Sequence, residues 1–507
     1  MVDLIASNLV AMVFICVNVS VQRLLVFLVV LSLSPQAMAQ TFYVAPNGND
    51  QAAGGSAQNP WATITFALDQ VSDGAEILVA PGTYLGRVRL DRSFSIPVTI
   101  RSETPYQARL QRDGGSVVTC FACAGIILEG FDISHAPNNT GALVIQIQGN
   151  TTTNVVVRNN VIHDSTNNDL LKINNGAQNV LVEGNLFYTQ AGTDEHIDIN
   201  STIGVVVQDN VFFNTEAQSA TSSYIVIKDS NGGSDGIVGT KDTTVRRNVF
   251  LNWQGSSGQG FLRVGEDNTS NFEADGVLAE NNLMIGNSRT LMRSSFTVQG
   301  SRNINFRHNT VVGDLPSRAF AARLLRGTNN QANQQITFSN NIWSDPDGSM
   351  GLEGFLGSDV FEALSGSTSS VELDCNLYFN GGNAIPADTS QEVRFEQDSC
   401  SNMTDPGLPA QTNVQLPILT GNGFADGSAT IREVFMSLVN QFGIPNSTSV
   451  VIDAAGSNNS PMDDITGAAR DARADIGAFE VLNGGTPNTP GSEASLLPAW
   501  LLLLLDE

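Results

Sequence analysis

One pattern recurs along the middle of the chain and limits the folds available to it. A run of alternating apolar residues ends in an asparagine, and an apolar pair follows, as in VVVRNNVIHD (155–164), VLVEGNLFYT (180–189) and VVVQDNVFFN (205–214). The asparagine position recurs at Asn160, Asn185, Asn210, Asn248, Asn282, Asn309, Asn341 and Asn376. A repeat of about 25 residues with variable insertions is typical of a solenoid, in which each repeat packs only on its neighbours.

The repeat indicates strands, because its apolar residues recur with a period of 2 rather than 3.6. The L-x-x-L-x-L frame of leucine-rich repeats is missing. A parallel β-helix remains, in which each short strand pairs with its equivalent in the next coil. We expect the asparagines to stack as a ladder, with their amides hydrogen-bonded along the axis at the strand spacing of about 4.8 Å. The predicted fold class is therefore all-β, a parallel β-helix with helical caps.

Two amphipathic stretches flank the repeats and are predicted to be the caps. In residues 59–72, Asn59 and Pro60 suit a helix start, and an apolar stripe follows. Residues 429–442 are predicted to form a second helix, which is expected to cover the other end of the stack of coils. The chain then divides into an N-terminal cap segment (40–84), coils (85–400), a C-terminal cap segment (401–482) and a linker with a truncated anchor-like tail (483–507).

The N-terminus has the features of a secretory signal peptide over residues 1–39. A basic residue precedes the short apolar run RLLVFLVVLSL (23–33), and AMA (37–39) is a small-x-small cleavage site. An N-terminal membrane anchor is the alternative, but the run is short for a membrane span. We therefore expect a protein that is secreted or held at the cell surface, with a mature chain that starts at Gln40.

Charge and cysteine content narrow the class of partner. The net charge is −25, which argues against nucleic acid as a partner but allows an acidic ligand where basic residues cluster. In an exported protein, disulfides are favoured over zinc. We expect Cys120 to pair with Cys123 and Cys375 with Cys400. The second bond would close a loop, and the loop-entropy model predicts that this stabilises the fold by about 3 kcal/mol.

A second set of strands carries charge on its outward side. Alignment of LLKIN (170–174), HIDIN (196–200), YIVIK (224–228), FLRVG (261–265), LMRSS (291–295) and AARLL (321–325) gives three outward columns. The middle column is predicted to hold Lys172, Asp198, Val226, Arg263, Arg293 and Arg323. One flanking column holds His196, Tyr224 and Phe261, and the other holds Asn174, Asn200 and Lys228. A solvated strand face with weak ion pairs is the alternative to a binding groove.

Acidic residues cluster at the head of this face. Asp169 begins one strand, and Asp194, Glu195 and Asp198 follow one coil later. Carboxylates that converge across adjacent coils suit calcium, which takes six to eight oxygen ligands. The alternative to a calcium site is that these are ordinary acidic residues in the turns of an acidic protein.

Three segments resemble known families. Residues 42–84, with PNGND, NPW and PGTY, resemble the first segment of secreted right-handed β-helix proteins of the pectate-lyase-like superfamily. Residues 451–480 resemble the terminal segment of bacterial surface β-helix proteins with variable anchors. The acidic pattern is similar to calcium-dependent polysaccharide lyase family 9, which implies calcium ligands at Asp169, Asp194 and Asp198 and a lysine base at Lys228. Glu195 departs from that family's aspartate, and Lys172 is a rival base.

The sequence therefore predicts a lyase that cleaves an acidic, uronate-containing polysaccharide by calcium-assisted β-elimination. In this hypothesis Lys228 is the base and Lys172 binds substrate, together with His196, Tyr224, Arg263, Arg293 and Arg323. Two alternatives stay open: a surface protein that binds glycan without cleaving it, and a glycoside hydrolase that uses paired carboxylates. A monomer is expected, with attachment to the outer surface through the C-terminal tail.

Overall fold

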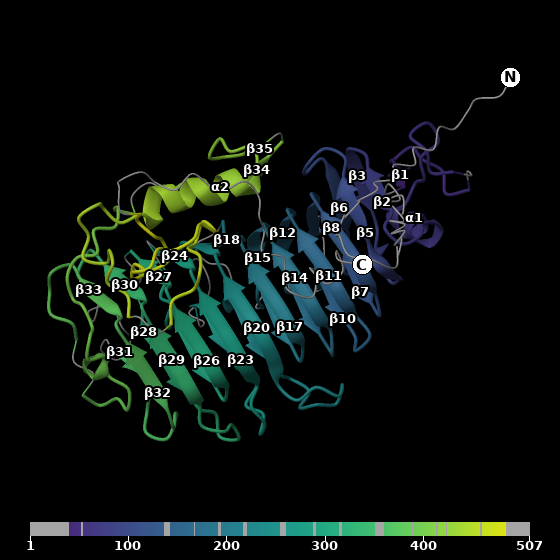
Figure 1. Cartoon of the computed structure of the whole chain (residues 1–507). Coiled ribbons are helices and arrows are strands. Elements are labelled where there is room, and N and C mark those ends of the chain that lie inside the picture. Colours follow the sequence, from purple (N-terminus) through teal and green to yellow (C-terminus); the bar gives the residue numbers. More distant parts are fainter. Residues whose placement is uncertain are drawn as a thin grey trace, which may run out of the picture. The chain divides into compact units, whose positions relative to one another are not determined.

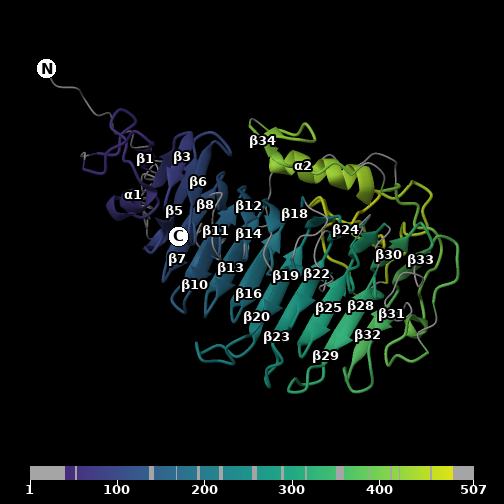
Figure 2. The ribbon, with the colours of Figure 1, turned by 180° about the vertical axis from the view of Figure 1, so that it is seen from behind.

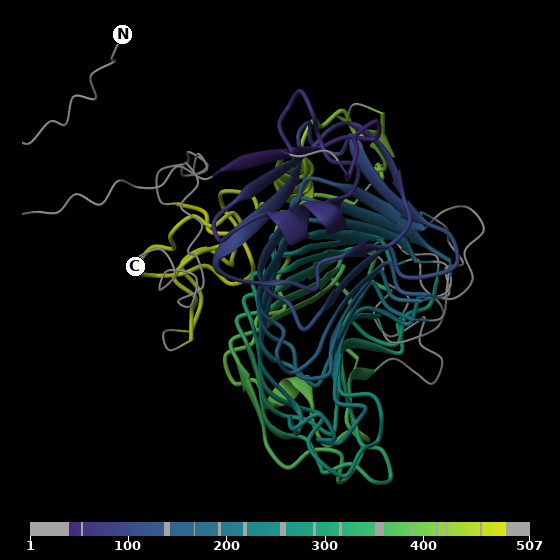
Figure 3. The ribbon, with the colours of Figure 1, turned by 90° about the vertical axis from the view of Figure 1, so that its right-hand side faces the viewer.

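The computed structural model describes residues 40–51, 54–135, 142–166, 168–190, 194–215, 221–253, 260–286, 290–313, 317–349, 359–386, 389–411, 414–421, 423–456 and 459–482. The predicted signal peptide and the C-terminal tail lie outside these residues. Nearly all the strands belong to three parallel sheets, stacked in register (Figure 1). Figure 3 looks along the stack, so that successive coils overlap. The structure is a parallel β-helix, as predicted.

Sheet 1 holds the strands that precede the asparagines. Its strands are β1 (Thr41–Val44), β2 (Glu76–Val79), β5 (Ser93–Ser102), β8 (Ala124–Glu129), β11 (Thr153–Arg158), β14 (Gln178–Glu183), β17 (Ile203–Gln208), β20 (Thr240–Arg246), β23 (Ala274–Glu280), β26 (Arg302–Arg307), β29 (Gln334–Ser339) and β32 (Val371–Asp374). The pairing of β1 with β2 starts the solenoid at Thr41, well before the predicted start of the coils at residue 85.

Sheet 2 holds the strands that follow the asparagines. Its strands are β3 (Gly82–Leu85), β6 (Ala108–Arg112), β9 (Asp132–His135), β12 (Val161–Ser165), β15 (Leu186–Gln190), β18 (Val211–Phe213), β21 (Val249–Leu251), β24 (Leu283–Ile285), β27 (Thr310–Val312), β30 (Ile342–Asp345) and β33 (Leu377–Asn380).

Sheet 3 is the predicted charged sheet, and most of its strands are labelled in Figure 2. They are β4 (Val88–Arg89), β7 (Val118–Phe121), β10 (Ile145–Gln148), β13 (Leu171–Asn174), β16 (Ile197–Asn200), β19 (Ser223–Lys228), β22 (Gly260–Val264), β25 (Phe296–Gln299), β28 (Ala319–Leu325) and β31 (Asp359–Glu362).

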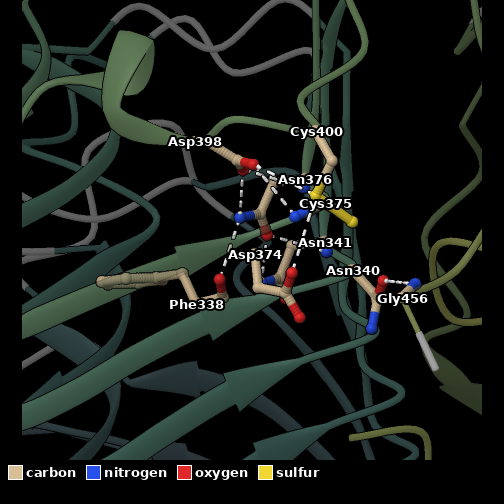
Figure 4. The surroundings of a disulfide bond; sticks show 9 residues. All are labelled: Phe338, Asn340, Asn341, Asp374, Cys375, Asn376, Asp398, Cys400 and Gly456. Carbon is tan, nitrogen blue, oxygen red and sulfur yellow. Dashed lines mark hydrogen bonds between the residues drawn. A yellow bond between two sulfur atoms is a disulfide. The ribbon is translucent and has the colours of Figure 1, made fainter. Parts of the chain in front are cut away.

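The asparagine ladder lies between sheets 1 and 2. Each amide nitrogen donates to the side-chain oxygen of the next asparagine at 2.8–3.1 Å, from Asn160 through to Asn376. All eight side chains are buried. Asp398 ends the ladder by accepting from the backbone and side-chain nitrogens of Asn376 at 2.9 and 2.8 Å (Figure 4). The bond between Cys375 and Cys400 lies beside this cap, and Cys120 is joined to Cys123.

Both helices differ from their predicted form. Helix α1 spans Ile64–Gln70, and its N-cap is Thr63 rather than Asn59. The reason is that Trp61 forms a bridge with Val44, so the chain is still extended there. Helix α2 spans Ile431–Leu438 and continues as a π-helical turn, Val439–Gly443, while a short 3-10 turn spans Phe395–Gln397.

Helix α2 does not cover the end of the stack. It packs along the outer face of sheet 2, near β15, β18 and β24 (Figure 1). The apolar side chains of this outer face are buried with those of the helix; they include Val161, Leu186, Val211, Val249 and Leu283. The hairpin of β34 (Leu419–Thr420) and β35 (Gly423–Phe424) precedes α2. No helix in the described parts of the chain is long and apolar enough to cross a membrane.

Candidate functional site

The charged face is built by four neighbouring strands of sheet 3, β13, β16, β19 and β22. Their register places Lys172 beside Asp198, Asp198 beside Val226, and Val226 beside Arg263. A neighbouring column runs from Asn174 through Asn200 to Lys228. Both columns agree with the prediction, because Leu171, Ile173 and their equivalents fill the core and turn the alternate residues outward.

The prediction for Arg293 is wrong. Thr297 takes the place between Arg263 and Arg323 in the column. Strand β25 begins at Phe296, and Phe296 and Val298 are the apolar residues that face the core. Its inward pair therefore lies four residues after the predicted pair, and Arg293 precedes the strand.

His196, Tyr224 and Phe261 do not form an outward column. All three side chains are fully buried. His196 lies with its ring centroid 4.6 Å from that of Tyr224, and its Nε2 is 2.9 Å from the side-chain oxygen of Asn214. The Tyr224 hydroxyl donates to the carbonyl of Leu251 at 3.0 Å. These rings pack inside the solenoid, so they cannot bind substrate on the charged face.

Three carboxylates converge at the head of this face. Asp169, Glu195 and Asp198 are each at least 96% buried and each offer one oxygen, and these oxygens all lie within 4.8 Å of one another. Calcium binds oxygens at about 2.3–2.6 Å, so one ion can contact ligands with this separation. In addition, the Oδ1 atom of Asp198 is buried and accepts no hydrogen bond within the described part of the chain. The residues present therefore fit a metal ion that binds oxygen ligands.

The buried negative charge affects the protonation of this group. Burial first, and the charge of Asp198 second, raise the pKa of Asp169 to about 7. Burial and the charges of Asp169 and Asp198 also raise the pKa of Glu195. A cation favours the ionised form of such carboxylates. The fourth predicted ligand, Asp194, is only half-buried and is not part of the group of three.

Both lysines contact this group. Lys172 donates to the Oδ2 atom of Asp198 at 2.5 Å and lies 3.5 Å from Asp169. Lys228 lies 3.7 Å from the same Oδ2 atom. Burial alone would lower the pKa of each lysine, but neighbouring carboxylates outweigh burial and raise both values. The nearby Arg263 therefore does not bring the pKa of Lys228 below its ordinary value.

Asp198 is the main cause of the raised pKa of Lys228, and Glu266 is the next. The Oε2 atom of Glu266 accepts from Lys228 at 2.6 Å, and its Oε1 atom lies 2.6 Å from the guanidinium of Arg263. Asp267 adds a further carboxylate at 3.8 Å from Lys228. The turn that presents them needs Gly265, which has a φ of +84° and where a Cβ atom would lie 1.7 Å from the carbonyl oxygen of Gln299. In the sequence, Glu266 and Asp267 are marked only as an acidic pair after Gly265, which does not identify Lys228 as their partner.

The third predicted substrate-binding arginine is also held by an acid. Arg323 is 3% exposed, and its Nε atom donates to Glu362 at 2.6 Å. Glu362 is the next residue in the column. Thr297 separates Arg263 from Arg323 in the column, and each arginine contacts its own acid, so that no two like charges are adjacent there. Both arginines are thus engaged by acids, whereas the group of Asp169, Glu195 and Asp198 keeps an oxygen that accepts no hydrogen bond from the described residues.

Comparisons with known proteins bear on the fold. No protein-family model and no curated protein sequence matches the chain. Among solved structures, pectate lyase Pel9A is 15% identical with a TM-score of 0.49, covering 87% of this chain and 96% of its own. A rhamnogalacturonan lyase is 13% identical with a TM-score of 0.45, covering 80% and 99%. A mannuronic acid specific family 6 polysaccharide lyase from human gut microbiota is 12% identical with a TM-score of 0.47, covering 74% and 88%.

These similarities are to parallel β-helix proteins that act on carbohydrates, and they include a GH136 lacto-N-biosidase from Eubacterium ramulus as well as lyases. At these identities and TM-scores the similarities carry no argument about this chain, whose fold is defined by its own sheets. The reading of the site therefore depends on its own residues.

Proposed function

We propose that this protein is a calcium-dependent lyase that cleaves a uronate-containing polysaccharide by β-elimination. The observation that carries the proposal is the buried group of Asp169, Glu195 and Asp198, with two lysines at its border and one oxygen that has no hydrogen-bond partner among the described residues. A bound calcium ion would supply positive charge for the substrate carboxylate, whose neutralisation makes the proton at C5 easier to remove.

The lysines have separate roles in this proposal. Lys228 removes the proton, and Lys172, held charged by Asp198, binds a substrate carboxylate. Lys228 must first lose its own proton and its contact with Glu266. Glu266 can keep its contact with Arg263 through its other oxygen when it moves away from Lys228. The contacts of Lys228 with Asp198 at 3.7 Å and Asp267 at 3.8 Å must lengthen as well.

The contacts of the lysines also favour a second function, glycan binding without cleavage. Both side chains are paired with carboxylates, and a charged lysine is a good ligand for an acidic sugar and a poor base. In that case the site would bind an acidic glycan at the cell surface. Export and attachment there are part of this proposal, and the presence of the protein in culture medium or in the envelope fraction tests them.

Depolymerisation assays separate these functions. Pectate, alginate and glycosaminoglycans would each be incubated with the protein in calcium and in chelator, and the loss of chain length followed. We expect cleavage of one of them in calcium only. Asp198→Asn should abolish both cleavage and the rise in melting temperature on adding calcium. The matched control is Asp275→Asn, which changes an aspartate of sheet 1 that pairs with Arg302 at 2.7 Å. Binding without cleavage at any calcium concentration would leave only the second function.

A further inference from the structure

A recess lies on the outer face of sheet 2, on another sheet from the carboxylate group. It is a cavity of about 520 Å³, and its floor is formed by β6, β9, β12 and β15. Leu419 and Gly421 of the C-terminal segment form its rim. The Gln107 side chain donates to the carbonyl oxygen of Gly421 at 2.6 Å, and the ring of Tyr106 packs against Phe424 at 5.5 Å. The recess therefore has a wall that the fold holds in place, and its size is that of a small-molecule site.

The recess exists because a stack of rings ends there. Register places His163, Tyr188 and Phe213 in one outward column. Their rings are stacked, with centroids 4.7 and 5.0 Å apart. The next position toward the N-terminus is Ser134, whose side chain is too small to continue the stack. Ser134 is buried and accepts from the Gln111 side chain at 3.1 Å, and the His163 side chain is 13% exposed. A flat group in the recess would therefore meet the exposed part of the His163 ring.

The polar groups around this position are of both signs. The Nε2 and Nδ1 atoms of His163 lie 2.8 Å from Asp132 and 3.0 Å from Asp164. Arg109 is half exposed, and its Nε atom donates to Asp132 at 2.8 Å. Two cationic and two anionic side chains therefore leave the recess with no net charge. Because carboxylates engage both ring nitrogens, His163 is not placed to transfer protons, and the recess is suited to binding rather than to catalysis.

We propose that this recess is a second carbohydrate-binding site, and that it takes a neutral sugar unit. Such a unit has a flat apolar face for the ring of His163 and hydroxyl groups for Arg109 and Asp164. Charge-bearing side chains make strong hydrogen bonds to hydroxyls, and the balanced charge gives no preference for an acidic sugar. The site is on another sheet from the carboxylate group, so it is independent of the proposed lyase activity.

The experiment measures binding of neutral oligosaccharides by calorimetry and saturation-transfer NMR, with cellotetraose, xylotetraose and galactotetraose as probes. Ser134→Phe should abolish binding, because its ring would complete the stack and fill the recess. Arg109→Ala should weaken binding about tenfold or more through loss of a charged hydrogen bond. Melting temperatures of both variants would show that each is folded.

Lys228→Ala is the matched control, since it changes sheet 3 only and should leave this binding unchanged. The proposal would be overturned if no probe bound the wild-type protein at millimolar concentration, or if Ser134→Phe and Arg109→Ala bound as well as wild type. Loss of lyase activity in Lys228→Ala would not affect it, so the two proposals fail separately.

Discussion

Replacement of one asparagine in the ladder should destabilise the solenoid strongly. Asn210 is fully buried, and its amide nitrogen donates to the carbonyls of Val182 and Gln208 and to the side chain of Asn248 at 2.8–3.0 Å. Its oxygen accepts from the backbone and side-chain nitrogens of Asn185 at 2.9 and 3.0 Å. Asn210→Ala removes all of these hydrogen bonds at once.

The magnitude follows from these contacts. A buried hydrogen bond contributes about 1 kcal/mol net, and a buried donor that is left without a partner costs about 1–3 kcal/mol. The backbone N–H of Asn185 would be left in that state, while the other partners lose one of several bonds. We therefore expect Asn210→Ala to lower the free energy of unfolding by about 4 kcal/mol. Asn210→Asp should not restore stability, because its carboxylate would face three oxygen acceptors.

Chemical denaturation followed by circular dichroism measures this loss. Asn150→Ala is the control, because Asn150 is exposed in a turn and surface substitutions are usually within about 0.5 kcal/mol of neutral. Hydrogen exchange should show that the added opening is centred on the coils of Asn185, Asn210 and Asn248, since repeats interact mainly with their neighbours. A loss for Asn210→Ala as small as that of the control would refute the assignment of the ladder as a main source of stability.

Three further predictions follow from other contacts. Replacing both Cys375 and Cys400 with serine should lower stability by about 3 kcal/mol, and peptide mapping without reduction should link these two cysteines in the wild-type protein. Burial alone would lower the pKa of His163, but Asp132 and Asp164 raise it to about 9, so the stability that this pairing gives is fully present below about pH 6.5 and is lost as pH rises through 9. That loss, up to about 3 kcal/mol, should be missing from denaturation curves of His163→Gln. Lys228→Ala should abolish turnover and leave glycan affinity nearly unchanged, whereas Lys172→Ala should chiefly weaken affinity; the reverse pattern would exchange the two roles.

The repeat was sufficient to predict the fold. A strand period of 2 and one recurrent asparagine fix both the pairing and the side of each residue, and the structure has Asn185 and Asn210 adjacent on successive coils. The columns through Lys172, Asp198 and Arg263 followed from the same alternation. Local pattern is informative here because each coil contacts mainly its two neighbours.

Several of the features that the sequence could not predict lie where alternation stops. His196 precedes the strand that starts at Ile197, so the period of 2 no longer determines its direction, and its ring turns into the core. Arg293 fails for a related reason, since the insertion before β25 shifts the start of the strand. The partner of Lys228 is Glu266, 38 residues away on the next coil, and such a contact depends on the turn at Gly265 rather than on any local pattern.

The mass of the products formed from an acidic polysaccharide tests the central claim most directly. β-Elimination breaks the glycosidic bond without adding water, so the new non-reducing end carries a double bond and the product is lighter by one water than the hydrolysis product. We predict such unsaturated products, with their ultraviolet absorbance, in calcium and none in chelator. Saturated products of the hydrolytic mass, or an acidic polysaccharide that is bound and recovered intact, would contradict the lyase assignment.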